Sequence, residues 1–397
     1  MNINLISDRN QNNIKKEMKL CHVSANGIKL MVEKSQFHVI KISHFDNRGL
    51  NILKQESLSI GAETAVSQDV GNFTKGYSDA LLFATLAQIK TLIKKLQVQP
   101  FQLKKLASQL SDLINNNSII YQIGRKKFDF TNKAYVMGIL NITPDSFYDG
   151  NQYLSKISFQ KRLEQMIEDK VDIIDIGAES TRPGAEKISP KEELKRLLPL
   201  LKLARKLTTL PISIDTYKSQ VALAALDNGA DMINDISGLH FDKKMASVVG
   251  KAKASLVVMH IKGNPKNMQS NPKYTNLVPE ILEYLHESLE LAKKSKISQV
   301  LIDPGIGFGK TVAHNYEIIN KLPDLKILKQ PILVGLSRKS MIGKVLNLPP
   351  EKRLPATMAL NLLALNNGAS VIRVHDIKEG RQTIKLAQEL KKSRGNI

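Results

Sequence analysis

Residues 171–184 read Val-Asp-Ile-Ile-Asp-Ile-Gly-Ala-Glu-Ser-Thr-Arg-Pro-Gly, a short apolar run that passes directly into polar residues and glycine. A nearly continuous apolar run of this length is typical of a parallel strand that is buried on both faces. In parallel α/β folds, functional groups gather where such strands end. The stretch therefore predicts a buried strand over residues 171–176 that presents chemistry at its carboxyl end.

Similar apolar runs recur along the second part of the chain, at residues 135–140, 211–214, 231–234, 255–259, 299–302, 331–334 and 369–374. Amphipathic stretches such as 191–207, 218–228 and 279–294 lie between them, with the spacing of helices. Eight strands that alternate with helices predict an α/β fold of the (β/α)8 TIM-barrel type. An open doubly wound sheet is the structural alternative, because closure of the sheet cannot be read from one sequence.

Two domains are expected, a barrel over residues 119–397 and a smaller N-terminal α/β domain of unknown role over residues 1–118. Apolar runs at 119–123 and 126–130 flank Gly124 and predict a hairpin in a position to close the bottom of the barrel. In the smaller domain, residues 37–45 alternate like a strand, whereas 77–96 and 102–114 show helical periodicity.

The composition is that of a globular protein, with 42% hydrophobic and 24% charged residues among 397. The net charge of +21 invites a nucleic-acid-binding interpretation. Against it, the basic residues comprise 46 Lys and only 12 Arg, they are spread over both domains, and Trp is absent. We expect a solvated, Lys-rich surface and no nucleic-acid partner.

The chain contains one cysteine, Cys21, so an intramolecular disulfide is excluded. We see no signal peptide and no apolar stretch long enough for a transmembrane helix. We therefore expect a cytoplasmic protein without a membrane partner.

Every predicted strand is followed directly by polar or ionisable side chains, among them Asn141, Asp215, Asn234, Asp303 and Arg373. One such residue has a plain explanation, because Asp and Asn often cap the following helix. Since the carboxyl ends of barrel strands meet at one face, eight such ends favour one converging site. Carboxylates and cations together suit a substrate with a polar ring and an anionic tail.

Residues 305–311, Gly-Ile-Gly-Phe-Gly-Lys-Thr, look like a phosphate-binding loop but lack its spacing. A Walker A loop needs a glycine where Pro304 stands, and a dinucleotide fingerprint needs one where Lys310 stands. The glycines are better explained by close approach of the backbone to a flat ligand. We interpret His260, a lone histidine at a strand end, as structural.

Seven ordered motifs together resemble the dihydropteroate synthase family of pterin-binding barrels: residues 138–147, 179–184, 214–216, 234–236, 303–305, 337–340 and 373–376. The resemblance covers residue 119 to the C-terminus. It implies a transferase of folate biosynthesis that condenses 6-hydroxymethyl-7,8-dihydropterin pyrophosphate with p-aminobenzoate, giving 7,8-dihydropteroate and pyrophosphate. It also implies Mg²⁺ as cofactor and a homodimer.

The resemblance assigns roles to individual residues. Asp215, Asn234, Asp303 and Lys339 are similar to the family's pterin-binding residues, and an ionised carboxylate suits the donor edge of that ring. Asp215, Lys339 and Arg373 are the implied catalytic residues, because a fixed carboxylate stabilises the pterin cation that forms as pyrophosphate leaves.

The remaining roles concern the second substrate and the leaving group. Asn141, Arg373 and His375 resemble the pyrophosphate pocket, with Asn141 as a ligand of Mg²⁺. The p-aminobenzoate pocket is represented by Phe147, Thr181, Arg182, Pro183 and Ser340.

The sequence departs from the family pattern at Ile261 and Lys262, at Tyr148 and at Asn151, which concerns loops rather than the reaction class. Residues 1–118 do not resemble the pyrophosphokinase fused to some relatives, so no second activity is predicted.

Two other functions remain open at this point. A pterin-binding methyltransferase would share Asp215, Asn234 and Asp303 but has no need of the motifs at 180–183 and 337–340. A basic protein that binds RNA or a regulatory partner would use residues 1–118.

Overall fold

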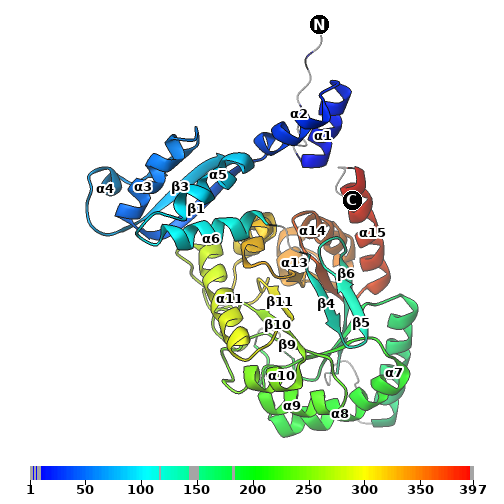
Figure 1. Cartoon of the computed structure of the whole chain (residues 1–397). Helices are drawn as coiled ribbons and strands as arrows, with labels where there is room; N and C mark the ends of the chain where they lie inside the picture. Colours follow the sequence, from blue (N-terminus) through cyan, green and yellow to red (C-terminus); the bar gives the residue numbers. More distant parts are fainter. Residues whose placement is uncertain are drawn as a thin grey trace. The chain divides into compact units, whose positions relative to one another are not determined.

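The computed structural model (Figure 1) describes residues 3, 6, 10–115, 118–142, 152–180 and 184–393, with backbone only for 152–155. Its contacts divide the chain into two compact units, one of residues 118–389 and one formed mainly by residues 1–117. No helix within the described ranges is both long and apolar enough to span a membrane.

The larger unit is a closed barrel of eight parallel strands. They are β6 Tyr135–Asn141, β7 Ile173–Gly177, β8 Ile212–Asp215, β9 Met232–Asp235, β10 Ser255–Met259, β11 Val300–Asp303, β12 Leu333–Val334 and β13 Val371–Val374. Their order is β11-β10-β9-β8-β7-β6-β13-β12. A bridge between Ile302 and Ile332 joins the two end strands, and the Ile302 N–H donates to Pro331 O at 3.0 Å. The predicted TIM barrel is thus confirmed, and the doubly wound alternative is excluded.

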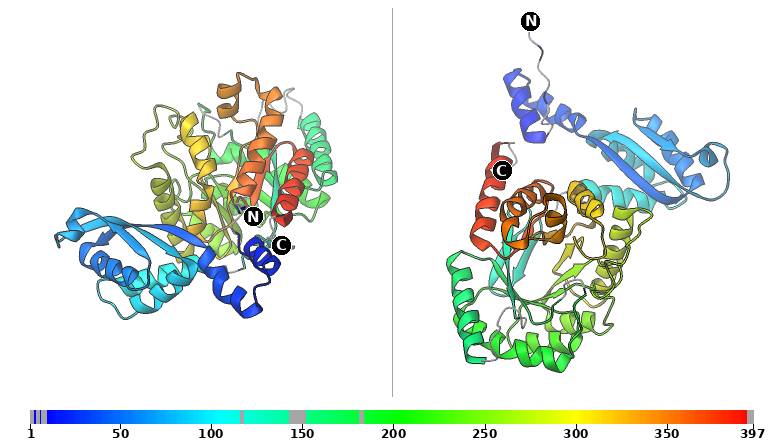
Figure 2. Two further views of the ribbon diagram at one scale, coloured as in Figure 1. Left: turned by 90° about the horizontal axis from the view of Figure 1, so that it is seen from above. Right: turned by 180° about the vertical axis from the view of Figure 1, so that it is seen from behind.

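Helices connect the strands and surround them (Figures 1 and 2). They are α7 Gln152–Glu168, α8 Pro190–Leu207, α9 Ser219–Asp227, α10 Met245–Ala252, α11 Leu277–Lys294, α12 Val312–Asn320, α13 Ser340–Leu346, α14 Leu354–Asn366 and α15 Ile377–Ser393. Local chemistry explains where α8 begins, because Ser189 accepts from the Glu192 N–H and Pro190 occupies the first turn. Its apolar face, with Leu197 and Leu201, is buried against the strands.

Side chains along each barrel strand alternate between the barrel interior and the surrounding helices, and this alternation places the polar side chains at the strand ends. On β7, Ile174 and Ile176 belong to the core between strands and helices, whereas Ile173 belongs to the core inside the barrel. Successive side chains point to opposite faces, so Asp175 shares the inward face of Ile173 one step nearer the carboxyl end. The interior is therefore apolar at the amino end and polar at the carboxyl end.

A hairpin closes the amino end of the barrel. Strands β4 Ile120–Ile123 and β5 Lys126–Asp129 pair antiparallel, as the sequence predicts. Tyr121 and Phe128 lie in one apolar cluster with inward residues of the strands, and the Tyr121 hydroxyl donates to Val300 O at 3.1 Å.

The smaller unit is an antiparallel three-stranded sheet with helices. Its elements are α1 Gln11–Leu20, α2 Ala25–Met31, β1 Phe37–Asp46, α3 Asn47–Leu58, β2 Glu63–Val66, α4 Gln68–Gly71, β3 Tyr77–Thr85, α5 Leu86–Leu96 and α6 Leu103–Ile114, with sheet order β1-β3-β2. Leu53 of α3, Leu82 of β3 and Leu92 of α5 share its core.

The helical interpretation of residues 77–96 is wrong for its first part, because Tyr77–Thr85 is the central strand β3. Ala80, Leu82 and Ala84 are buried and Leu81 between them is exposed, a period of two. A continuous apolar run does not distinguish helix from strand by periodicity, so only pairing with β1 and β2 decides it.

Candidate active site

The carboxyl ends of five barrel strands bring inward-facing polar side chains together. Four of them are residues that the sequence predicts for the site: Asp215 on β8, Asn234 on β9, Asp303 on β11 and Arg373 on β13. Asp215, Asn234 and Asp303 are each less than a tenth exposed. Burial of so many polar groups requires partners, because an unpaired charge in the interior is costly.

Arg373 provides the central pairing. Its Nε donates to Asp175 Oδ2 at 2.6 Å and its Nη2 to Asp215 Oδ2 at 2.8 Å. Asn234 Nδ2 donates to the same Asp175 Oδ2 at 3.2 Å. Asp175, which the sequence reasoning missed as a site residue, therefore links Arg373 to Asn234, and Arg373 in turn links it to Asp215. Its position on the inward face of residues 171–176, two residues after Ile173, was the available signal.

The two carboxylates keep unused hydrogen-bonding capacity. Within the part of the chain that the structure describes, Asp175 Oδ1 and Asp215 Oδ1 are buried without a hydrogen-bond partner. Burial raises the pKa of Asp215, while the adjacent Arg373 guanidinium opposes this rise and Asp175 adds to it. A buried acceptor of this kind is suited to donors or positive charge on a bound substrate.

Asp303 ends β11 next to a glycine-rich loop. Its Oδ1 accepts from the Gly305 N–H at 2.7 Å. Burial raises the pKa of Asp303, and the opposing effects come from Lys339, the Gly305 N–H, Lys310 and Arg373. The carboxylate therefore lies in a buried, predominantly positive environment.

Lys339 immediately precedes α13 and reaches the same loop. Its Nζ donates to the Ile306 carbonyl oxygen and lies 4.7 Å from the centroid of the Phe308 ring. Burial lowers the pKa of Lys339 to about 8, with Asp303 opposing the shift. Phe308 is a second residue that the sequence reasoning missed, although it was the one aromatic side chain of residues 305–311.

Asn141 lies in the same row of the barrel as Asp215. Asn141 pairs with Gly177 across β6 and β7, and Gly177 pairs with Asp215 across β7 and β8. Gly177 has no side chain; a Cβ there would lie 3.3 Å from Asn141 Oδ1 and 3.5 Å from Asp215 Cβ, so both side chains lie close to this glycine.

His375 and Ser340 are the other predicted site residues that the structure describes. His375 Nδ1 lies 2.9 Å from Ser337 Oγ, and Ser340 is exposed at the start of α13. Several predicted residues lie outside the described part of the chain: Phe147, Thr181, Arg182 and Pro183, together with Tyr148 and Asn151.

Comparison with known proteins identifies the barrel. The model of the family described as pterin binding enzyme matches residues 137–375, which contain all the strand ends described above. The chain belongs to this family. The dihydropteroate synthase of Synechocystis sp. is 44% identical over 271 residues, which cover 68% of this chain and 94% of that enzyme.

Two further relatives cover different lengths of the chain. A Yersinia pestis dihydropteroate synthase, solved with a sulfonamide drug complex, is 36% identical with a TM-score of 0.65 and covers 69% of this chain and all of its own. A bifunctional dihydropteroate synthase/dihydropteroate reductase of Helicobacter pylori is 36% identical over 366 residues, covering 91% of this chain and 93% of that protein.

These relatives confirm the function that the motifs predict. The chain is a transferase with dihydropteroate synthase activity, which condenses 6-hydroxymethyl-7,8-dihydropterin pyrophosphate with p-aminobenzoate in folate biosynthesis. The methyltransferase alternative is set aside, because curated relatives that match the barrel at 43–44% identity are named for the synthase.

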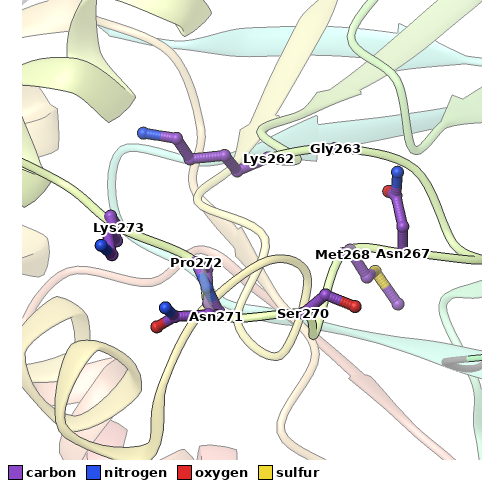
Figure 3. Close-up of a pocket in the computed structure, with 8 residues that line it drawn as sticks. All are labelled: Lys262, Gly263, Asn267, Met268, Ser270, Asn271, Pro272 and Lys273. Atoms are coloured by element: carbon purple, nitrogen blue, oxygen red, sulfur yellow. The ribbon is translucent and has the colours of Figure 1, made fainter.

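A surface pocket lies in the segment that follows the carboxyl end of β10 (Figure 3). It has a volume of about 370 Å³ and is lined by residues of the segment that follows β10: Lys262, Gly263, Asn267, Met268, Ser270, Asn271, Pro272 and Lys273. None of the predicted pterin residues lines it. Lys262, one of the departures from the family pattern, pairs with Glu280 Oε2 at 3.0 Å and lies 4.2 Å from the Tyr274 ring centroid. This departure thus contributes to packing of the loop on α11.

We predict that Asp175→Ala lowers kcat/KM by about a hundredfold or more, because Arg373 and Asn234 both lose the acceptor that orients them. Loss of one partner of a buried ion pair should also cost about 3–5 kcal/mol of stability. Steady-state kinetics and urea unfolding measure the two effects.

Asp172 supplies the matched control. It pairs with Lys126 at 2.6 Å and with Arg381 at 2.9 Å, away from the site. Asp172→Ala should lower the stability and leave kcat/KM within about twofold of the wild type. Equal losses of kcat/KM in both variants would contradict a positioning role for Asp175.

Proposed function

We propose that the dihydropterin ring lies at the carboxyl end of the barrel against Asp303, Asn234, Lys339 and Asp215. The observation that carries this proposal is the convergence of these groups in a buried layer. An ionised carboxylate offers two acceptors, which complement the 2-amino and ring N–H donors of a pterin, and an ammonium group offers donors to a ring oxygen or nitrogen.

The proposed mechanism is mainly electrostatic. The bond between the pterin methylene carbon and the pyrophosphate oxygen breaks, and the amine nitrogen of p-aminobenzoate forms the new bond to that carbon and releases a proton. Asp215 holds negative charge beside the carbon on which positive charge develops. Its unpartnered Oδ1 supports this role, since Oδ2 is already held by Arg373. Arg373 and Lys339 complete the proposed catalytic set.

The leaving pyrophosphate is proposed to lie against Asn141, Arg373 and His375. Among the residues with a described position, no group of three or more His, Cys, Asp or Glu forms a metal site. This donor set fits Mg²⁺ only as an ion carried by the pyrophosphate, because Mg²⁺ keeps several waters and takes few protein ligands. Asn141 would supply one amide oxygen, and the bound ion would neutralise charge on the leaving group.

The second substrate is proposed to bind near Ser340, with Phe147, Thr181, Arg182 and Pro183 completing the p-aminobenzoate pocket. The support here is the family resemblance, together with the position of Ser340 directly after Lys339. A homodimer and a cytoplasmic location are proposed on the same resemblance.

Calorimetry tests the substrate assignment and its metal. Dihydropterin pyrophosphate should bind about tenfold more weakly without Mg²⁺, and p-aminobenzoate should bind only with that ligand or pyrophosphate present. In Asn141→Ala the dependence on Mg²⁺ should shrink to less than about twofold, because the protein ligand is lost. Asn320→Ala, on the exposed end of α12, is the control. Absence of pterin binding to the wild type would overturn the substrate assignment.

The basic limb of the pH profile tests Lys339. Since its pKa is lowered to about 8, kcat/KM for the pterin substrate should fall as the pH rises through that value and the ammonium loses its proton. Lys339→Arg keeps the charge, so its limb should move upward by more than one pH unit, whatever the loss in maximal rate. An unchanged limb in Lys339→Arg would contradict the assignment.

We infer a second candidate activity from the length of one match. The match to the Helicobacter pylori protein covers 91% of this chain, so it takes in much of residues 1–117 and is not confined to the barrel. It also covers 93% of that protein, which leaves little room there for a separate reductase domain. Reduction of 7,8-dihydropteroate adds a hydride and a proton, which a nicotinamide or reduced-flavin donor would supply.

Mass spectrometry tests this activity in the full chain. With 7,8-dihydropteroate and NADH, NADPH or reduced flavin, we expect a product two mass units heavier and stoichiometric oxidation of one of these donors. Reactions without protein control for direct chemical reduction. Product formation no faster than in that control, with every donor, would overturn the reductase proposal and leave the synthase unaffected.

A further inference from the structure

Lys310 is a buried lysine to which the mechanism above gives no role. It ends the glycine-rich stretch 305–310 and is 2% exposed. Three acceptors surround its Nζ: His260 Nδ1 at 2.8 Å, Phe308 O at 3.0 Å and His260 O at 3.4 Å. Burial lowers the pKa of Lys310 well below its usual value, and the nearby Asp303 carboxylate opposes this shift. An ammonium group has three N–H donors and no acceptor, so three acceptors around Nζ favour the charged form of the side chain against the effect of burial.

His260 is the neutral partner. Burial, followed by the charge of Lys310, lowers the pKa of His260 to about 2, so its ring carries no charge at neutral pH. To accept from Lys310, Nδ1 must present its lone pair, which places the ring proton on Nε2. The expected structural role of His260 is thus a contact with Lys310, across 50 residues of sequence.

The loop between Asp303 and Lys310 packs directly on the end of β10. Gly305 and Gly309 both have positive φ, and a Cβ at either position would overlap the backbone carbonyl oxygen of His260 or Lys262. Figure 3 shows Lys262 and Gly263 on this segment. Lys310 Nζ donates to His260 of the same segment, so it joins the loop to the end of β10 where the backbone contact is closest.

This loop carries the contacts that orient two pterin residues. The Gly305 N–H donates to Asp303, and the Ile306 carbonyl accepts from Lys339. A shift of the loop would therefore move both side chains, and displacements of about 1 Å at such sites cost large factors in rate.

We propose that Lys310, held by His260, is a positioning residue for pterin recognition that fixes the Gly305–Gly309 loop and places a second positive charge beside Asp303. This inference rests on the proposed assignment of Asp303 and Lys339 to the pterin.

The charge of Lys310 has a separate consequence for pH dependence. The charged groups that face Lys310 are Asp303, Lys339 and Lys262, beside the neutral His260. Those that lower the pKa of Asp303 are Lys339, Lys310 and Arg373. Removal of Lys310 leaves Asp303 with less positive charge, so its pKa rises. Asp303 is then protonated at a higher pH, so an activity that needs its carboxylate declines sooner as the pH is lowered.

Lys310→Met tests the inference, because it keeps an unbranched side chain that is only one atom shorter and removes its donors and charge. We expect dihydropterin pyrophosphate to bind about tenfold more weakly at pH 8. The acid limb of kcat/KM, to which Asp215 with its pKa raised to about 7 also contributes, should move to higher pH, while KM for p-aminobenzoate changes less than about twofold. Lys321→Met, at the exposed end of α12, is the control. If Lys310→Met does not fold, Lys310→Gln takes its place.

Asp303→Asn separates the possible failures. If this variant loses pterin binding but Lys310→Met and Lys310→Gln keep wild-type affinity and acid limb, the role of Lys310 is wrong and the site assignment stands. If Asp303→Asn itself binds the pterin as the wild type does, the site assignment fails and the inference fails with it. Weaker pterin binding in a folded Lys310 variant with an unmoved acid limb would overturn the charge effect.

Discussion

The arrangement of the polar side chains in the barrel depends on one partly buried guanidinium. Arg373 lies between Asp175 and Asp215 inside a barrel whose lower interior is apolar. Charges in such surroundings are stable only when paired and hydrogen-bonded, so each of the three side chains limits the positions of the other two. Asn234 is held by the same carboxylate oxygen. These ion pairs and hydrogen bonds therefore allow a layer of ordered polar side chains to exist at the end of an apolar core.

The lower half of the barrel makes this arrangement possible. The β4–β5 hairpin and the inward residues of the strands fill the amino end with large apolar and aromatic side chains, including Phe128 and Met137. Because strand residues alternate between faces, the inward positions continue from this core into Asp175, Asp215 and Asp303. The rigid packing below thus fixes the heights and directions of the functional groups above.

Two lysines, Lys339 and Lys310, hold the loop after β11 in a similar way, through contacts between buried polar groups. Lys339 contacts that loop through the Ile306 carbonyl oxygen, and Lys310, at the end of the loop, contacts His260. Lys339, Lys310 and Arg373 together offset the tendency of burial to protonate Asp303. The glycines at 305 and 309 permit the backbone to pack where any side chain would collide. The stretch that resembles a phosphate-binding loop is, in this fold, a support for carboxylate and ammonium groups.

The sequence by itself determined the alternation of strands and helices, the family, and the residue types at the strand ends, because these signals are local in the chain. Apolar runs of four to six residues in the sequence are enough to predict β7 or β11. Only the tertiary structure decided that the sheet closes through Ile302 and Ile332, and that Tyr77–Thr85 is a strand. It also decided that Asp175, 198 residues from Arg373, holds that guanidinium. Such partners are chosen by packing across the fold, where low polarity makes an unpaired charge costly, and spacing along the chain does not record them.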